Sequence, residues 1–482
     1  MASERPPIEP IRSAFKFQYH SDEQLDRLRD ATLAILENVG VKFPSKRALT
    51  VLAGAGCAVD AATRIVRFPR EVVLKHMARV PRYFNLSARD AACDLDLADG
   101  FTFFTNDGCG AEAIDPVSGK RRPSRKEDVA RMAHISDYLS AISFFWPPVA
   151  ATDYRENARL HELDAAFNNT SKHVQGMVLG AETAKRAIEM ATVIAGSEAE
   201  RRRRPPLSSL VCTVQPLMQD EDGIEAAMLF AEASVPVGFM SMPTYGTTAP
   251  ATMAGAFAMG DAEIISATVL IQMLVPGAPV FHSMIGNAAD PRTGGYVPKP
   301  LNRHGRQLVI EIAHHWGMPT LGGCFGTASE APGTWQSAAE VAIDPYIAGL
   351  VGAELVTGIG LNNVFTLLWP HAIILDADIY HRARWALAGV EISDETLALD
   401  VIAKVGPGGH FLGEQHTRRH MRESFVGGLQ HQPGADGHYR DPVEVARERA
   451  DWILANHVPE PLAADQKAEL KRILAAADRE VR

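Results

Sequence analysis

The stretch LVCTVQPLMQDEDGIEAAMLFAEASVPVGFMS, residues 210–241, shows the unit from which the fold is built. Residues 210–214 and 235–241 are short apolar runs typical of buried strands, and residues 220–233 between them have the spacing of an amphipathic helix. A strand, a helix and a second strand in this order predict a βαβ unit, in which both strands lie parallel in one sheet.

The same alternation continues along most of the chain. Eight such apolar or β-branched runs occur, with Ala-, Glu- and Leu-rich helical stretches between them, at residues 101–105, 142–146, 173–178, 210–214, 235–241, 279–285, 318–324 and 355–359. Eight parallel strands that alternate with helices are the elements of a closed barrel. The sequence therefore predicts an α/β fold, a (β/α)8 TIM barrel over residues 101–360.

The two ends of the chain are predicted to be helical. Residues 1–100 contain an amphipathic stretch that begins at Asp22 and ends at Gly40. Residues 361–482 are mostly helical in pattern, are interrupted by GPGG at 406–409, and are predicted to pack on the barrel. The turn signature DPVSG at 115–119 predicts a hairpin near 111–123, inserted after the first strand.

Composition and charge restrict the class of protein. The chain has 482 residues, 46% of them hydrophobic, and a formal net charge of −10, which argues against a nucleic-acid-binding surface. The N-terminus, MASERPPIEPIRSAF, lacks the apolar segment of a signal peptide. The uncharged stretch 264–289 is interrupted by Pro276, Gly277 and Pro279, so we expect buried core and no membrane span. These features predict a cytoplasmic protein.

Cysteine and histidine patterns give little support for a metal site. The five cysteines are scattered and form no CxxC pair, so neither a disulfide framework nor a structural zinc site is indicated. His416 and His420 are spaced i, i+4, but no HExxH motif is present, and we expect no bound metal. Cys324 follows a strand, where a thiolate is possible, although a buried free cysteine is the commoner outcome.

The active site of such a barrel lies at the C-terminal ends of its strands. In this sequence those ends are rich in amides and aromatics and poor in carboxylates, as in Asn106-Asp107, Gln175-Gly176 and Asn362-Asn363. A metal-dependent hydrolase needs several His and Asp residues at this position. The composition therefore favours a reaction that uses few acid–base groups.

Specific motifs lie mainly in the C-terminal third. Residues 375–379 read LDADI, residues 405–412 read VGPGGHFL, and His416-Thr417 follow. Upstream, Trp335-Gln336 and Glu340 precede GLVGAELV at 349–356, and Arg121-Arg122 follow the DPVSG turn. Together these motifs resemble the trimethylamine:corrinoid methyltransferase family over nearly the whole chain.

The resemblance implies a barrel methyltransferase that moves a methyl group from a methylated amine to Co(I) of a corrinoid protein. Trimethylamine enzymes of the family carry pyrrolysine, and this sequence has none, so it is similar to the non-pyrrolysine branch, whose known substrates are mainly betaines such as glycine betaine. Residues 327–334 depart from the family pattern, where members carry an Asp and a Lys, so a changed substrate pocket is plausible.

The sequence also bears on partners. Corrinoid-binding domains use a D-x-H-x-x-G motif, which this sequence lacks, so the corrinoid (cobalamin) is expected on a separate cognate protein. We further expect a homo-oligomer that binds neither membrane nor nucleic acid.

A quaternary amine needs aromatic faces for its cation and a donor for any carboxylate. The aromatic candidates at or near strand ends are Phe104, Trp146, Tyr245, Phe325, Trp335 and Trp369, and the polar candidates are His282, His371 and Arg292. The family motifs add Gln336 and Glu340 to the substrate site, and Asn362, Gly408, Gly409 and His416 as candidate corrinoid contacts.

Two other functions stay open at this point. One is a metal-dependent barrel lyase or hydrolase, which metal analysis of the purified protein would distinguish. The other is a barrel that binds a corrinoid protein and acts on a different N-methyl compound, or one that has lost turnover with any amine.

Overall fold

The computed structural model describes residues 5–108, 110–294, 300–324, 326–424 and 428–480. At its centre is a seven-stranded sheet in which all neighbouring strands are parallel. The strands lie in the order β6 (Phe103–Phe104), β16 (Leu355–Thr357), β15 (Thr320–Cys324), β13 (Val280–Met284), β11 (Val237–Ser241), β10 (Leu207–Cys212) and β9 (Val174–Gly176). Seven of the eight predicted runs thus form strands, and the α/β class is confirmed.

The one remaining run, residues 142–146, forms no strand, although it lies between the two edge strands β6 and β9. The N–H of Ser143 donates to the carbonyl of Phe104 (2.8 Å), and the N–H of Phe145 donates to the carbonyl of His173 (2.8 Å). Pro147 and Pro148 follow directly, and proline cannot donate to a strand ladder. The sheet is therefore curled, and an irregular segment joins its edges in place of an eighth strand.

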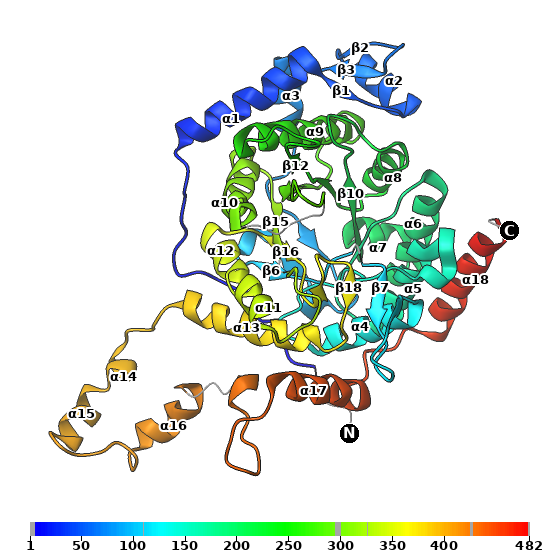
Figure 1. Cartoon of the computed structure of the whole chain (residues 1–482). Coiled ribbons are helices and arrows are strands. Elements are labelled where there is room, and N and C mark those ends of the chain that lie inside the picture. Colours follow the sequence, from blue (N-terminus) through cyan, green and yellow to red (C-terminus); the bar gives the residue numbers. More distant parts are fainter. Residues whose placement is uncertain (1–4, 109, 295–299, 325, 425–427, 481–482) are drawn as a thin grey trace.

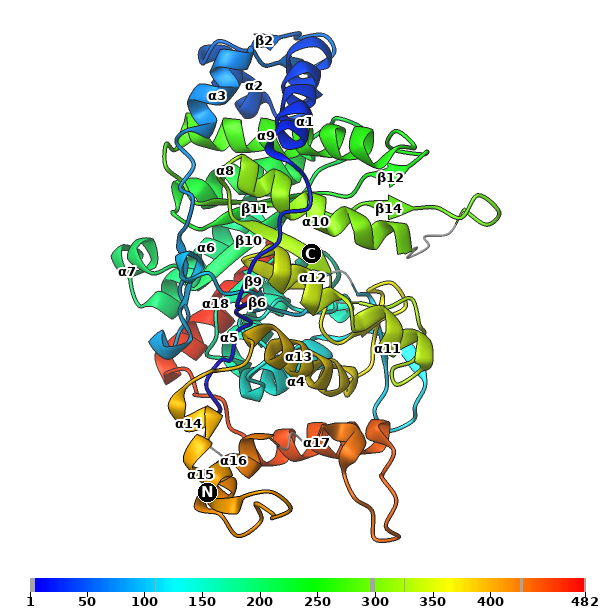
Figure 2. The same ribbon diagram turned by 90° about the vertical axis from the view of Figure 1, so that its left-hand side faces the viewer.

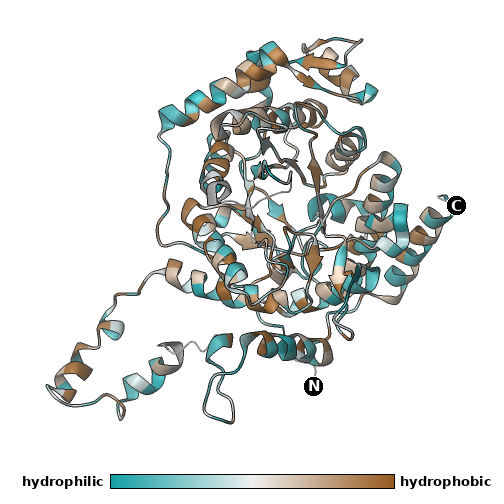
Figure 3. Ribbon diagram, in the orientation of Figure 1, coloured by the Kyte–Doolittle hydropathy of each residue, from teal (hydrophilic) through white to brown (hydrophobic). Residues whose placement is uncertain are grey.

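Helices cover the outer face of the sheet (Figure 1). They are α4 (Lys126–Tyr138), α5 (Ala158–Asn169), α6 (Ala181–Ala195), α8 (Glu221–Glu232), α9 (Met253–Leu274), α10 (Pro300–His315), α12 (Asp344–Val351) and α13 (Ala372–Ala388). The short α7 (Glu198–Arg203) packs against α6, and α11 (Trp335–Val341) packs against α12. Among the described residues, α9 is the one helix long and apolar enough to cross a membrane, and 89% of its apolar window is buried inside the fold. Figure 3 shows hydrophobic residues gathered in the central strands.

Smaller sheets surround this centre. The inserted hairpin consists of β7 (Glu112–Ile114) and β8 (Arg121–Pro123). Together with β17 (Leu361–Asn362) and β18 (Leu367–Leu368) it forms a four-stranded sheet. Beyond the ends of β11 and β13, β12 (Thr244–Tyr245) pairs with β14 (Asn287–Ala288). The hairpin of β4 (Asn85–Leu86) and β5 (Leu95–Asp96) contributes Leu86, Leu95 and Leu97 to the apolar cluster that contains Phe103 and Phe281 of the sheet.

The N-terminal region combines helices with a small antiparallel sheet. It contains α1 (Asp22–Ala34), β1 (Val41–Lys42), α2 (Lys46–Gly54), β2 (Ala58–Val59), β3 (Ile65–Arg67) and α3 (Arg70–Met77). Ser21 caps α1, because its side chain accepts from the N–H of Gln24 while the Gln24 side chain accepts from the N–H of Ser21. Helices α1 and α3 pack against α9, which places this region on the outer surface of the body (Figure 2).

The C-terminal region begins with an arm. Its helices are α14 (Asp394–Leu397), α15 (Leu399–Val405) and α16 (Gln415–Ser424), and they project away from the body in Figures 1 and 2. The chain then returns along the body, where α17 (Pro442–Asn456) packs against α13 and α4, and α18 (Ala464–Glu480) packs against α6 and α5.

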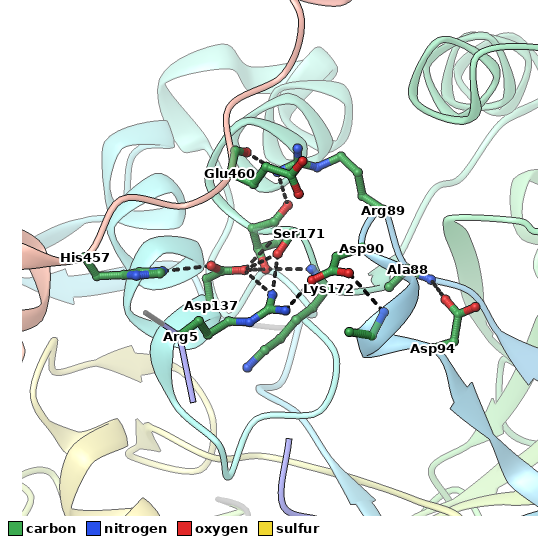
Figure 4. Close-up of polar contacts among 12 residues, drawn as sticks. Arg5, Ala88, Arg89, Asp90, Asp94, Asp137, Ser171, Lys172, His457 and Glu460 are labelled. Atoms are coloured by element: carbon green, nitrogen blue, oxygen red, sulfur yellow. Dashed lines mark hydrogen bonds and ion pairs between the residues drawn. The ribbon is translucent and has the colours of Figure 1, made fainter. Parts of the chain in front are cut away.

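Lys172 occupies a buried position just before β9 (Figure 4). Its ammonium group donates to the carbonyls of Ser136 (2.7 Å), Leu139 (2.8 Å) and Ile142 (2.6 Å). Burial lowers the pKa of Lys172 to about 8, so the side chain is still mostly protonated at neutral pH. The three carbonyls belong to the end of α4 and the turn after it, where a helix leaves acceptors without donors.

The buried carboxylate of Asp137 connects this region to both ends of the chain (Figure 4). It accepts from the hydroxyl of Thr170 (2.8 Å), the N–H of Ser171 (2.8 Å) and the imidazole of His457 (2.8 Å), and Arg5 lies 3.6 Å away. Burial by itself raises the pKa of Asp137, but the bond from His457 and the charge of Lys172 outweigh it and hold the pKa well below its usual range.

Replacing the Lys172 ammonium should destabilise the whole body. Lys172→Met keeps most of the side-chain volume but removes the ammonium donor from all three carbonyls. Leu139 keeps the N–H of Ile142 (3.1 Å), whereas the buried carbonyls of Ser136 and Ile142 lose their ammonium partner, at a cost of about 1–3 kcal/mol each. We expect a decrease in the free energy of unfolding of about 3 kcal/mol or more, measured as a lower denaturant midpoint. The control is Lys185→Met, an exposed lysine paired with Glu182, which should change stability by less than about 0.5 kcal/mol. Equal stability of the two variants would contradict the role given to Lys172.

Asp376 of α13 should make stability depend on pH. It accepts from the N–H of Gly360 (2.8 Å), and burial raises its pKa to about 7, compared with 3.8 for an ordinary Asp. Between these two pH values the folded chain holds a proton that the unfolded chain has lost, so stability falls as pH rises through this window. Asp376→Asn keeps an acceptor for Gly360 and removes the titration. Its stability relative to the parent should improve between pH 5 and pH 8 by on the order of 2 kcal/mol.

The measurement is a series of denaturant unfolding curves across this pH range. Asp400→Asn, which changes an exposed carboxylate on the arm, is the control and should give a difference that does not depend on pH. A flat difference for Asp376→Asn as well would show that Asp376 titrates normally in the folded chain.

Candidate functional site

The concave face of the curled sheet carries the candidate site. Residues paired in register on parallel strands point to the same face, and the register joins Phe103, Leu355 and Leu321 across three strands. These belong to one apolar cluster with side chains from the other strands and from segment 142–146. Its members on these elements are Phe103, Phe144, Trp146, Leu210, Met240, Phe281, Leu321 and Leu355, with Met177, Cys212, Met242 and Ile285 packed against it.

Trp146 is brought onto this face by the irregular segment. The backbone N–H of Trp146 donates to the hydroxyl oxygen of Thr105 (3.1 Å). The hydroxyl of Thr105 in turn donates to the carbonyl of Phe144 (2.7 Å). The indole lies directly against the backbone of Gly108, where a Cβ atom would stand 1.9 Å from the indole nitrogen. Glycine at position 108 is therefore required for the observed placement of the ring, which is almost fully buried.

Gln175 of β9 places an unpaired amide on the same face. It is in register with Ser208, which joins it to the inward-facing side chains of β10. Its side chain is fully buried, and neither its amide nitrogen nor its amide oxygen has a partner within the described part of the chain. An unpaired buried polar group costs about 1–3 kcal/mol, so this amide is available to bind a ligand that offers both a donor and an acceptor, or a carboxylate.

Charged groups of both signs lie near Cys212, at the C-terminal end of β10. The pKa of this thiol is raised to about 11, mainly by burial and also by the charge of Asp107, while the charge of Arg159 acts in the opposite direction. One terminal nitrogen of Arg159 donates to Glu162 (2.9 Å), and the other lies 4.0 Å from the sulfur of Met177. Met177 follows β9 directly, and Asp107 lies in the loop after β6, so a guanidinium from α5 and a carboxylate both lie at the C-terminal ends of the strands that flank segment 142–146.

Glu263 of α9 supports the neighbouring loop. Its carboxylate accepts from the hydroxyls of Thr213 (2.6 Å) and Ser241 (2.8 Å), at the ends of β10 and β11, and from the N–H of Leu217 (2.7 Å). Burial raises the pKa of Glu263, although the hydrogen bonds partly offset that effect. These bonds hold two strand ends on one helix and keep the edge of the site in place.

Two of the predicted substrate residues lie on the outer face of the sheet. Phe104 packs edge to face with Tyr380 of α13, at 4.9 Å between ring centres. The imidazole of His282 lies 3.1 Å from the carboxylate of Asp261 on α9. Their sequence neighbours Phe103 and Phe281 occupy the concave face instead, because successive side chains of a strand alternate between faces.

Three predicted substrate residues, Trp335, Gln336 and Glu340, lie on α11, which follows the loop after β15. Trp335 is 89% exposed at the start of α11, and the exposed Gln336 donates to Glu340 (3.2 Å). Glu340 accepts from the hydroxyl of Thr327 and the N–H of Ala328, both at 2.7 Å, so it shapes the loop that departs from the family pattern. Phe325 lies outside the described residues.

Tyr245 lies on the short β12 strand, outside the concave face. Its ring is 6.1 Å from that of Phe257 on α9, and its hydroxyl stands over Gly286. That hydroxyl is buried without a described partner, and burial raises the pKa of Tyr245 to about 12.

Trp369 and His371 line a separate cavity of about 450 Å³ between the 115–119 turn and α17. The indole N–H of Trp369 donates to the carbonyl of Glu330 (2.8 Å), and the two rings lie 5.7 Å apart. Arg292 is exposed and paired with Asp290.

The predicted corrinoid contacts are divided between two places. Asn362 is buried on β17, and its side-chain oxygen has no partner among the described residues. Gly408, Gly409 and His416 belong to the arm. Of the predicted site residues that the structure describes, only Trp146 lies on the concave face beside Gln175 and near the Asp107–Arg159 charges.

Three residues of this group were not predicted as site residues. Asp107 and Gln175 were recognised at strand ends, but the preference for aromatics left them out of the substrate site. Arg159 has no local signal, because it lies in a helix and reaches the strand ends only through the fold. A search for polar residues at or just beyond the C-terminal end of each strand would have found the first two.

Comparisons with known proteins give the family. A family model described as trimethylamine methyltransferase (MTTB) matches residues 3–481. The chain is 30% identical over 460 residues to trimethylamine methyltransferase MttB of Desulfitobacterium hafniense strain DCB-2, with 94% of this chain and 92% of that protein covered. It is 28% identical over 475 residues to glycine betaine methyltransferase of D. hafniense strain Y51, with 97% and 98% covered.

Among solved structures, monomethylamine methyltransferase (MtmB) of Methanosarcina barkeri matches with a TM-score of 0.47 and 14% identity, over 92% of this chain and 95% of that one. The family match extends over almost the entire chain and agrees with the motifs in its C-terminal third. This chain belongs to the trimethylamine methyltransferase (MTTB) family and is a methyltransferase.

Proposed function

We propose that this chain moves a methyl group from a quaternary amine that carries a carboxylate, of the glycine betaine type, to Co(I) of a corrinoid held by a partner protein. The relatives include both a trimethylamine and a glycine betaine methyltransferase, so the family by itself leaves the amine open. The choice between them rests on the charges at the strand ends.

One observation carries the proposal: a carboxylate and a guanidinium lie around the same strand end, beside a buried indole. A betaine has a cation and an anion a few bonds apart. Trp146 offers an aromatic face to the cation, and Asp107 offers it a negative charge. Arg159 and the unpaired amide of Gln175 offer donors to the carboxylate. Trimethylamine has no carboxylate that could accept a hydrogen bond from Arg159.

The chemistry requires positioning more than acid–base catalysis. A quaternary nitrogen already has a positive charge, so a neutral amine leaves when the methyl group departs and no proton has to move first. The apolar side chains of Met177, Met242 and Ile285 exclude water around the site and strengthen the charge interactions there. The residues of this chain therefore act by holding the N-methyl group in one orientation.

The corrinoid would supply the nucleophilic cobalt, and this chain has to leave its strand ends accessible to the protein that carries it. Figure 2 shows α11 and the β12–β14 pair on one side of the molecule, beyond the ends of the strands that precede them. Trp335 on α11 is 89% exposed. A partner that docks on this side would cover an indole that is otherwise in water, which is typical of interface aromatics.

The shape of the fold fits this function. Because segment 142–146 bonds to both β6 and β9, we infer that it takes the eighth position of a (β/α)8 barrel. The site would then occupy the C-terminal end, where barrel enzymes carry their active sites.

The substrate class predicts a split between amines when Arg159 is changed. With the cognate corrinoid protein as acceptor, the parent should demethylate glycine betaine faster than dimethylglycine and much faster than trimethylamine. Arg159→Gln should raise KM for glycine betaine about 10- to 100-fold, because it removes a charge-assisted hydrogen bond of about 1.5–3 kcal/mol. The low rate with trimethylamine should not change further.

Two controls accompany this measurement. Arg159→Lys keeps a positive charge beside Glu162 and should recover part of the loss. Arg186→Gln removes a partly buried arginine of α6 that is paired with Glu189 and Glu480, and it should leave KM unchanged. Rapid turnover of trimethylamine, with none of the betaine, would show that the proposed substrate class is wrong.

Trp146 should contribute to binding of the cation already in the ground state. Trp146→Leu keeps an apolar side chain but removes the aromatic face, so KM should rise by up to about 30-fold, equivalent to about 2 kcal/mol, with a smaller effect on kcat. Phe104→Leu is the matched control, because that ring lies on the outer face of the sheet. It should lower the melting temperature and leave KM unchanged. A rise in KM for Phe104→Leu but not for Trp146→Leu would show that the cation does not bind at Trp146.

A further inference from the structure

The arm that follows α13 shows no hydrophobic core among its described side chains. No residue from 388 through 421 is buried, and apolar side chains such as Ile392, Leu399 and Leu412 are largely exposed. Figure 3 shows α15 in the hydrophobic colour although it projects from the body. Short helices in water are marginally stable unless tertiary packing supports them. Some interaction other than apolar burial has to hold α14 and α16 together.

Three potential metal ligands meet where α14 and α16 cross. His416 and His420 are one turn apart on α16, and their ring centres are 4.5 Å apart. Glu395 of α14 faces them, with its carboxylate 3.2 Å from Nε2 of His420 and its backbone carbonyl 3.1 Å from Nε2 of His416. One ligand atom from each residue lies within 4.8 Å of the other two.

We propose that Glu395, His416 and His420 bind one divalent transition-metal ion of the zinc type, with water in the fourth position. Two imidazoles and a carboxylate are a common donor set for zinc. Bonds of 2.0–2.1 Å in a tetrahedral site place ligand atoms about 3.4 Å apart, so small side-chain rotations bring the three atoms into position. The proposal is independent of the proposed function, because it concerns the arm and not the strand ends.

The charges around the cluster are compatible with this site. The hydrogen bond from His420 and the charge of Arg419 lower the pKa of Glu395, so its carboxylate is ionised at neutral pH. Arg419 lies 3.0 Å from Oε1 of Glu395, the oxygen that His420 also contacts, and it can remain there when the other carboxylate oxygen binds a metal. A metal at this position would close the loop that carries the GPGG sequence of residues 406–409 and fix its orientation.

The test is metal binding by the untagged full chain after removal of metals with a chelator. Calorimetric titration with Zn²⁺ should give one ion per chain, and hydrogen exchange of residues 389–424 should slow when Zn²⁺ is present. Glu395→Gln, His416→Ala and His420→Ala should each weaken binding at least tenfold. His410→Ala, an exposed histidine of the same arm, is the matched control and should bind like the parent.

Thermal unfolding of each variant shows whether the body remains folded. Failure of the parent to bind Zn²⁺ at micromolar concentrations would overturn the proposal. Binding by the triple variant with the same affinity as the parent would also overturn it, because the ion would then have another site.

Discussion

The buried ammonium of Lys172 is the interaction on which the rest of the body depends. Carbonyls at the C-terminal end of a helix attract a positive charge, and here a single side chain serves three of them at the end of α4 and in the following turn. A buried charge is tolerated only when hydrogen bonds and an opposite charge compensate for lost hydration. The neighbouring carboxylate of Asp137 supplies that compensation.

This requirement explains how distant segments come together. Because Asp137 must also be satisfied, it accepts hydrogen bonds from the segment that leads into β9 and from the segment after α17, and it lies close to Arg5 of the N-terminal segment. The carbonyl of Ile142 is occupied by Lys172 at the start of the segment that joins the two edges of the sheet. The same segment carries Trp146 to the concave face. The polar network at the start of the segment, around Ile142, therefore helps to position the indole at its end.

The proposed site and the arm illustrate two different ways to hold functional groups. At the strand ends, segment 142–146, β9 and α5 position Trp146, Gln175 and Arg159, and all three elements pack in the body. In the arm, helices without a core would depend on side-chain ligands and an ion for their arrangement. A site of the first kind is precise because packing fixes it, whereas one of the second kind can respond to the availability of its metal.

The sequence by itself determined the α/β class, the positions of the strands of the central sheet and the family, because these depend on local periodicity and contiguous motifs. It did not determine which face each strand residue would occupy. Strands covered on both faces are apolar throughout, so no alternation distinguishes Phe103 from Phe104, or Phe281 from His282. It also predicted a strand at 142–146, where the carbonyl of Ile142 binds Lys172 and two prolines end the segment.

Only the tertiary structure placed Arg159 near Cys212, and Glu395 beside His416. These residues are far apart in sequence and have no shared motif, so their proximity is a consequence of how the helices pack. The face of a strand and the contacts between distant helices are settled by packing over the whole chain, and no local pattern contains that information.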